Sequence, residues 1–171
     1  SSISAGRYHT CGVASNGNGY CWGNGSEGRL GNGGTANSSV PVLVNQGARP
    51  GGVTFVSMTL GPRAQHSCAV GSDGNGYCWG YNGQGQLGNG STTGSNEPVL
   101  VSQGARPGGV TFSSIAGGGN HTCGLGSDGK GYCWGSNWYG RLGDGPTNDS
   151  SVPVLVSPGV CPAGETFTSV I

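Results

Sequence analysis

The sequence predicts an all-β protein made of three β-propeller blades, each with four short antiparallel strands, that do not close into a ring as a single chain. A pattern of histidine, paired cysteines, Trp-Gly and Leu-Gly occurs three times with the same internal spacing, over residues 9–33, 66–90 and 121–145. Four strand-like segments in a unit of about 55 residues are typical of a propeller blade. No apolar period of 3.6 residues accompanies the 39 glycines, so no helix is expected.

The strand segments follow the same order in each repeat. The first strands are expected at residues 3–5, 58–60 and 114–116, and the second at 9–14, 66–70 and 121–125. The third strands are expected at residues 20–23 and at the equivalent residues of the other two repeats. The fourth strands are expected at 40–44, 98–101 and 152–156. The sequences SNGNG, SDGNG and SDGKG separate the second and third strands, and their Gly and Asn tolerate the positive φ of tight turns. A proline near the start of each fourth segment suits the beginning of a strand.

The repeat period divides the chain into residues 1–56, 57–113 and 114–171, the last including the start of a next repeat. The step from Cys11 to Cys68 is 57 residues, and the step from Cys68 to Cys123 is 55. The two extra residues fall between Met58 and Cys68, where we expect a turn, because insertions are tolerated best in loops. Such repeats depend on their neighbours to cover their hydrophobic faces.

The composition alone would place this chain among disordered proteins, because it contains 39 Gly and 9 Pro and few large apolar residues. Two observations override that interpretation. The formal net charge is zero, so self-repulsion does not hold the chain open, and the apolar residues recur at a fixed period. We therefore expect a folded array with a small core in each repeat.

Charge argues against nucleic-acid binding, and hydropathy argues against a membrane span. Seven basic residues are balanced by seven acidic ones without a basic run, whereas nucleic-acid binding needs clustered Lys or Arg. No window approaches 18 apolar residues, so no membrane span is expected. Residue 1 is Ser and no signal peptide precedes it, which we interpret as a mature or excised segment.

Seven cysteines in a chain with so little core indicate an oxidising compartment. Six of them form equivalent pairs, ten residues apart, that face each other across the predicted hairpins: Cys11 with Cys21, Cys68 with Cys78, and Cys123 with Cys133. Directly opposed residues of an antiparallel pair are close enough for a disulfide. The alternative, a zinc site, usually needs C-x-x-C or H-x-x-x-H clusters, and the sequence has neither.

The seventh cysteine, Cys161, has no equivalent in the other repeats, where Arg49 and Arg106 stand at its position. An odd cysteine in a secreted chain indicates an intermolecular bond or a free thiol. Pairing beyond this segment or with a neighbouring subunit, and a buried free thiol, both remain open.

The run from His121 to Gly145, HTCGLGSDGKGYCWGSNWYGRLGDG, resembles the repeat of the regulator of chromosome condensation family. The match includes Asn137; the second copy has Asn82 at this position and the first has Gly25. The resemblance implies a propeller of about seven repeats in the family, more than this chain holds. The paired cysteines are similar to those of secreted members, so nucleotide exchange on a small GTPase, the activity of the nuclear relative, is not expected.

Residues present once in every repeat are expected to serve the architecture. His9, His66 and His121 each begin a strand, and hydrogen bonding to a neighbouring loop is favoured over a metal ring or general bases. Asp73 and Asp128 lie in turns and supply too few oxygens for calcium, which takes six or more. The tryptophans are expected to pack between blades: Trp22, Trp79 and Trp134.

Two departures from the repeat are candidates for function. Trp138 and Tyr139 place two large aromatic residues on a glycine-rich loop that carries Ser-Glu or Gly-Gln in the other repeats. They are candidates for stacking on a sugar or anchoring a partner protein; the alternative is local packing. Five N-x-S/T sequons are candidates for glycosylation: Asn24, Asn37, Asn89, Asn120 and Asn148.

These observations favour a non-catalytic extracellular or cell-surface scaffold, a structural unit of a surface or filamentous assembly. The alternative is a protein-binding or enzyme-inhibiting propeller module, such as the family's secreted members imply, and the third choice is carbohydrate binding. Expected partners are other copies of the chain or flanking repeats, in a ring or a fibre, and another protein. No enzyme signature is present, so we expect neither a catalytic residue nor a metal or cofactor.

Overall fold

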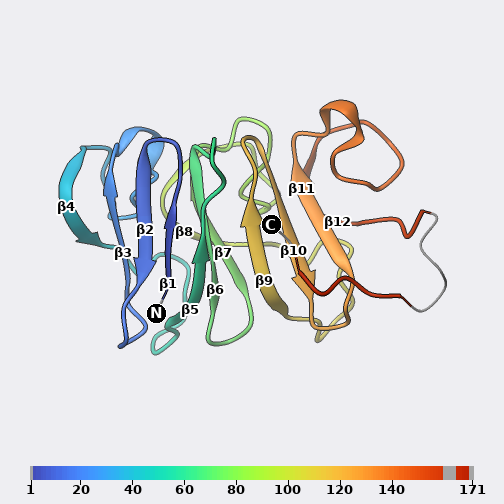
Figure 1. The fold of residues 1–171 in the computed structure, drawn as a ribbon, viewed down its shortest axis with the longest axis horizontal. Helices are drawn as coiled ribbons and strands as arrows, with labels where there is room; N and C mark the ends of the chain where they lie inside the picture. Colours follow the sequence, from blue (N-terminus) through green and yellow to red (C-terminus); the bar gives the residue numbers. More distant parts are fainter. Residues whose placement is uncertain (1, 160–164, 170–171) are drawn as a thin grey trace.

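Three four-stranded antiparallel sheets make up the computed structural model, which describes residues 2–159 and 165–169 (Figure 1). Blade 1 contains β1 (Ser2–Ala5), β2 (His9–Val13), β3 (Gly19–Gly23) and β4 (Ser38–Leu43). Blade 2 contains β5 (Phe55–Thr59), β6 (His66–Gly71), β7 (Gly76–Gly80) and β8 (Ser95–Leu100). Blade 3 contains β9 (Phe112–Gly117), β10 (His121–Gly126), β11 (Gly131–Gly135) and β12 (Ser150–Leu155).

The blades stand side by side in chain order, with blade 2 between the other two (Figure 1). The first strands contact one another from blade to blade, β1 with β5 and β5 with β9, whereas β4, β8 and β12 form the outer edges of the sheets. The array is therefore a partial propeller that is not closed, as the sequence predicted. One face of blade 1 and one face of blade 3 have no blade against them within the described residues.

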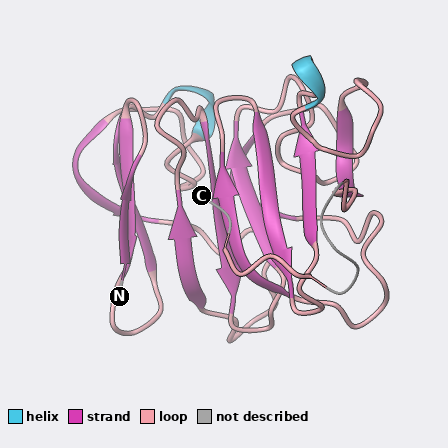
Figure 2. Ribbon diagram, turned by 45° about the vertical axis from the view of Figure 1, so that its right-hand side comes forward, coloured by secondary structure: helices cyan, strands magenta, loops and turns pink. Residues whose placement is uncertain are grey.

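Short 3-10 turns, η1 (Ser26–Gly28) and η2 (Trp138–Gly140), are the only helical elements in the described part of the chain. Both lie at the same end of the blades (Figure 2). Because the strands alternate in direction, the connections between first and second strands and between third and fourth strands share this end. We call it the long-loop end, formed by residues 6–8, 24–37, 60–65, 81–94, 118–120 and 136–149.

The largest departures from the predicted strand bounds are in the first and fourth strands. Strands β5 and β9 begin at Phe55 and Phe112, two residues before the expected repeat boundaries at 57 and 114, because each Phe already pairs with the second strand of its sheet. The fourth strands begin two or three residues earlier than expected, so that their proline lies in mid-strand. Proline is tolerated there because each is an edge strand, which can lack a donor on its open side.

The hairpin register places the cysteines as the spacing predicted. The partners Cys11 and Cys21 face each other between β2 and β3, and the two other pairs repeat this geometry, with Cα–Cα distances of 4.1 Å in all three disulfides. The two extra residues of the second repeat lie in the β5–β6 connection, where a turn was expected. Cys161 falls outside the described residues.

Candidate functional site

One backbone carbonyl organises the contact between blades 1 and 2. The carbonyl of Arg29 accepts a hydrogen bond from Trp79 Nε1 at 3.0 Å and another from Ser67 Oγ at 2.9 Å. His9 Nε2 bonds the same serine hydroxyl at 2.8 Å. The indole lies so close to Gly31 that a Cβ on this residue would be 2.6 Å from Nε1, which requires glycine.

Blades 2 and 3 meet through the same contacts. The carbonyl of Gln86 accepts from Trp134 Nε1 at 2.9 Å and from Thr122 Oγ1 at 2.8 Å. His66 Nε2 bonds the Thr122 hydroxyl at 2.8 Å. Trp79 and Trp134 are fully buried between blades, as predicted, whereas Trp22 of blade 1 is half-buried.

The histidines bind strands and not the loops that we expected. Since the Ser67 and Thr122 hydroxyls donate to carbonyl oxygens, His9 and His66 donate from Nε2 to them. Burial, with the charge of Arg29, lowers the pKa of His9 to about 4. Burial, with the neighbouring histidines, lowers the pKa of His66 to about 3. Both rings are therefore neutral at pH 7, because burial disfavours the charged form.

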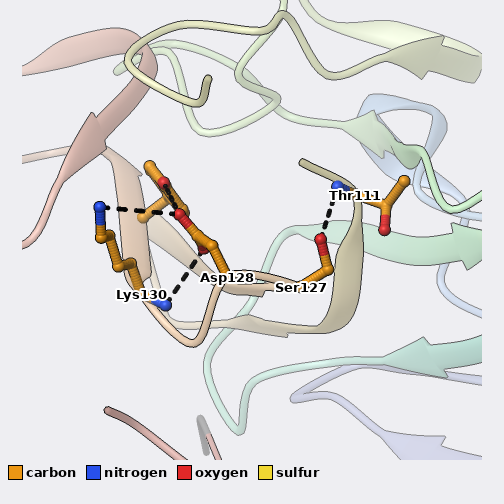
Figure 3. Close-up of polar contacts among 5 residues, drawn as sticks. Thr111, Ser127, Asp128 and Lys130 are labelled. Carbon is orange, nitrogen blue, oxygen red and sulfur yellow. Dashed lines mark hydrogen bonds and ion pairs between the residues drawn. The ribbon is translucent and has the colours of Figure 1, made fainter. Parts of the chain in front are cut away.

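The acidic turn residues have local partners. In the β10–β11 turn, Asp128 accepts hydrogen bonds from the Lys130 backbone N at 3.2 Å and the Tyr132 hydroxyl at 2.8 Å, and its Oδ2 lies 4.0 Å from Lys130 Nζ (Figure 3). Beside it, Ser127 Oγ accepts from the Thr111 backbone N at 3.2 Å. Asp128 thus closes a turn, and the described residues contain no group of three or more His, Cys, Asp or Glu side chains that could hold a metal ion.

Trp138 and Tyr139 are the most prominent apolar feature of the long-loop end. Their side chains are 70% and 94% exposed, and their ring centroids lie 6.2 Å apart in an edge-on arrangement. Tyr139 has φ of 65°, in the left-handed region that a bulky residue rarely occupies. Glu27, at the same position in blade 1, has φ of 61°, so this conformation is shared with a blade that lacks the aromatic pair.

The loop that carries the two rings is held rigidly by Asn137, which is fully buried. Its Oδ1 accepts from the Leu142 backbone N at 2.9 Å, and its Nδ2 donates to the Pro146 carbonyl at 3.0 Å. Its backbone N donates to Asp149 Oδ1 at 2.7 Å. A rigid loop presents the rings without a large loss of conformational entropy on binding.

The positions equivalent to the two rings are exposed in a blade that has a neighbour. Ser26 and Glu27 occupy these positions in blade 1 and are exposed, although their 3-10 turn η1 contacts β7 and β8 of blade 2. Local packing, the alternative considered for the pair, does not bury these rings.

All five sequons lie at the long-loop end, which also carries Trp138 and Tyr139. Asn37 and Asn148 are exposed, whereas Asn24, Asn89 and Asn120 are half-buried. The side chains of Asn24 and Asn89 accept hydrogen bonds from the backbone N two residues further on. The sequence set apart only Asn120, which abuts the strand predicted to begin at residue 121; it did not separate Asn24 and Asn89 from the exposed sites.

The fold and the interblade contacts define the class first: a segment of a β-propeller whose blades are sequence repeats. The sequence model described as "Regulator of chromosome condensation (RCC1) repeat" matches residues 16–70, 73–125 and 128–169, and a second model of this repeat matches residues 1–29 and 112–141. The chain therefore belongs to the RCC1 repeat family.

Curated relatives include the ultraviolet-B receptor UVR8 of Arabidopsis thaliana, 36% identical over 90% of this chain and 33% of the receptor. The human E3 ubiquitin-protein ligase HERC2 is 33% identical over 84% of this chain and 3% of the ligase. Human WBSCR16 has a similar structure, with a TM-score of 0.78 and 26% identity over 93% of this chain and 38% of that one. Yeast RCC1 (Prp20), solved bound to Kap60, has a TM-score of 0.73 at 22% identity over 91% of this chain and 36% of that one, and shows the fold alone. The chain thus spans a third or less of these two curated relatives.

No helix among the described residues is long and apolar enough to cross a membrane.

Proposed function

We propose that this chain is a non-catalytic protein-binding propeller segment that anchors its partner on Trp138 and Tyr139. The observation that carries the proposal is the pair of exposed rings on a loop fixed by the buried Asn137. Large aromatic residues on a rigid base are typical of the residues that dominate binding energy at protein interfaces. Its kinship with RCC1 repeat proteins, one of which was solved bound to Kap60, supports a protein as the partner.

A swap of loop residues tests the proposal without disturbing the fold. The double variant Trp138→Ser with Tyr139→Glu installs the residues of blade 1, where Glu27 adopts φ of 61° in the same turn. We expect partner capture to be lost while the urea midpoint is unchanged. The reverse graft, Ser26→Trp with Glu27→Tyr, should add a second binding site. Unchanged capture by the double variant would remove these residues from the site.

The same variants separate a protein partner from a sugar. Aromatic rings also stack on sugar faces, so carbohydrate binding is the main competing use of the pair. A glycan array probed with the wild-type chain and with the double variant decides between them. Binding to glycans that depends on the two rings, without capture of a protein, would favour the carbohydrate function.

A second candidate function is a structural scaffold that grows by adding blades. The specific support is that both interblade contacts are built in the same way, from a backbone carbonyl that accepts from a tryptophan and from a hydroxyl of the next blade. Electron microscopy of the purified chain should show rings or fibres. A monomer at every concentration tested would count against this function.

We assign the chain to the extracellular space or the cell surface, because three hairpin disulfides suit an oxidising compartment. In such a setting the exposed Asn37 and Asn148 are the sequons best placed to carry glycans. Peptide mapping after glycosidase treatment of the secreted protein tests this assignment. Occupancy confined to the half-buried sequons would contradict it.

A further inference from the structure

We infer that the partner places a cationic side chain, an Arg or Lys of a basic segment, against Trp138 and Tyr139. The inference rests on the protein-binding function proposed above and specifies the chemistry of the partner at that site. Its support is a pair of ring faces that no cation of the described chain covers, together with two carboxylates beside them that blades 1 and 2 lack.

The two rings form the walls of a corner. Their planes meet at 70° and their centroids lie 6.2 Å apart, and both residues are largely exposed. A cation seated in such a corner lies within about 6 Å of both centroids, the range in which the negative face of an aromatic ring attracts positive charge. The corner therefore offers two aromatic faces to one ammonium or guanidinium group.

No cation of the described part of the chain stacks on these rings. Three arginines there lie over aromatic rings, 3.9 to 4.7 Å from the centroids, and the rings belong to Tyr8, Phe55 and Phe112. The single ion pair among the described residues joins Lys130 to Asp128, in a turn at the opposite end of the blades. The ring faces of blade 3 are thus available to a cation that a partner supplies.

Two carboxylates lie at the base of the rings. Asp149 Oδ1 accepts a hydrogen bond from the backbone N of Asn137, the residue before Trp138, at 2.7 Å. Asp144 Oδ1 accepts from Asn137 Nδ2 at 3.2 Å. Neither carboxylate has a basic nitrogen within 4.0 Å in the part of the chain that the structure describes. Their charge is therefore left to attract a cation from outside the chain.

Arg141 is the only basic residue of the loop 136–149, and it reduces this attraction without cancelling it. Its Nε donates to the Trp138 carbonyl at 2.9 Å, which holds the guanidinium against the turn. Arg29 makes the same bond in blade 1, to the Ser26 carbonyl at 2.7 Å. Two acidic residues against one basic residue leave the loop of blade 3 with a net charge of −1.

The fold of the loop does not require these carboxylates. Blade 1 has Asn32 and Asn37 at the two positions, and the loop 81–94 of blade 2 contains no acidic residue. Asn37 Oδ1 accepts from the Gly25 backbone N at 2.9 Å, which is the bond that Asp149 makes in blade 3. Since a neutral amide makes the same bond, the negative charge is an addition to blade 3 that suits a basic partner.

The four positions stay accessible beside a neighbouring blade. In blade 1, whose turn η1 contacts blade 2, Ser26, Glu27 and Asn37 are exposed and Asn32 is half-buried. Their counterparts in blade 3 have the same accessibility. A blade packed on this side of blade 3 would therefore leave the rings and the carboxylates open to the partner.

The test removes the charge without changing the shape of the loop. Asp144→Asn with Asp149→Asn installs the amides of blade 1, and each amide keeps an oxygen for the bond that the carboxylate makes. The matched control is Asp73→Asn with Asp128→Asn. It removes the same charge from the turns at the opposite end of the blades, where blade 1 has Asn16.

The probes are acetylated and amidated peptides Gly-Ser-Gly-X-Gly-Ser-Gly in which X is Arg, Lys, citrulline or norleucine. Citrulline and norleucine resemble Arg and Lys in length but carry no charge. Binding is followed by nuclear magnetic resonance through the indole N–H signal of Trp138, which is assigned by its absence from the Trp138→Ser, Tyr139→Glu variant. Urea midpoints equal to that of the control exclude misfolding.

We expect the Arg and Lys peptides to bind the wild type and the control at least about 5-fold more tightly than the neutral peptides. In the Asp144→Asn, Asp149→Asn variant their binding should weaken by about 3- to 10-fold at low salt, and the difference should shrink as salt is added. Equal weakening in the control would show a net-charge effect and would overturn the inference, as would unchanged binding in the variant.

The remaining outcomes distinguish the cation from the protein-binding function. If neutral and charged peptides bind alike and the ring variant loses both, the pair anchors its partner by apolar contact, so the function stands and the cation is wrong. If no peptide shifts the Trp138 signal, the cation is also wrong. Partner capture that survives the loss of both rings would overturn the protein-binding function as well.

Discussion

Acid should weaken the blade interfaces because their histidines are buried in the neutral form. Burial lowers the pKa of His66 to about 3, whereas an unfolded histidine titrates near 6.5. A lowered native pKa stabilises the fold fully above pH 6.5, and this stability is lost as the pH falls toward the native pKa. Between pH 7 and 4.5 the unfolded state takes up a proton that the native state does not, which costs about 2.5 kcal/mol for such a histidine.

The change that isolates this effect is His66→Gln, which keeps an N–H donor for the Thr122 hydroxyl and does not titrate. Urea unfolding followed by tryptophan fluorescence reports this interface. The Trp134 indole donates to the Gln86 carbonyl, which also accepts from the Thr122 hydroxyl that bonds His66. We expect the variant to lose about 2.5 kcal/mol less than the wild type between pH 7 and 4.5. The carboxylates are common to both proteins, so their contribution cancels in the comparison.

The half-buried His121 provides the control, because burial also lowers its pKa but its ring remains partly hydrated. His121→Gln should change the pH dependence less than His66→Gln does. Equal pH dependence in the wild type and in His66→Gln would refute the reasoning. So would a nuclear magnetic resonance titration in which the native His66 ring takes up a proton near pH 6.

Three further predictions concern stability and pairing. Gly88→Ala should cost more than about 2 kcal/mol, because the new Cβ would be 2.6 Å from Trp134 Nε1, whereas Gly52→Ala, also at positive φ but in open space, should cost about 1 kcal/mol in urea unfolding. Asn137→Ala should lower the unfolding free energy by about 2–4 kcal/mol and increase proteolysis of the loop, since it leaves buried backbone groups without partners. Thiol titration of the unfolded, unreduced protein should find no more than one free cysteine, Cys161; a higher number would contradict the disulfide pairing.

The sequence predicts the blade well because the blade is a local structure. The spacing of ten residues and the turn glycines fix the hairpin register, so Cys11 and Cys21 face each other without reference to the rest of the fold. The strand limits were less predictable, since a proline such as Pro41 is compatible with mid-strand only when that strand is an edge. Edge position depends on the assembled sheet, which composition does not reveal.

The histidine partners were missed because they lie across a blade boundary. His9 bonds a residue 58 positions away and His66 a residue 56 positions away, each one repeat period plus one. The partner could have been found in the sequence, because a Thr or Ser follows each histidine. The hydroxyl of that residue bonds the histidine of the preceding blade. The tight turn of the aromatic pair was not predictable, since Tyr139 adopts a backbone conformation that its residue type disfavours.

The chemistry of the interblade contact explains how nearly identical repeats can carry different surfaces. The acceptor in both interfaces is a backbone carbonyl, so the side chain at that position is free to be Arg29 or Gln86 without loss of the two hydrogen bonds. The loops of blades 2 and 3 are each fixed by a buried amide, Asn82 and Asn137, and in blade 3 the next two positions are exposed. Substitution at these two positions is therefore expected to change the surface of the blade but not its contacts with its neighbours. Trp138 and Tyr139 are the expected result of such freedom: two exposed aromatic residues on one blade of a fold whose interblade contacts stay the same.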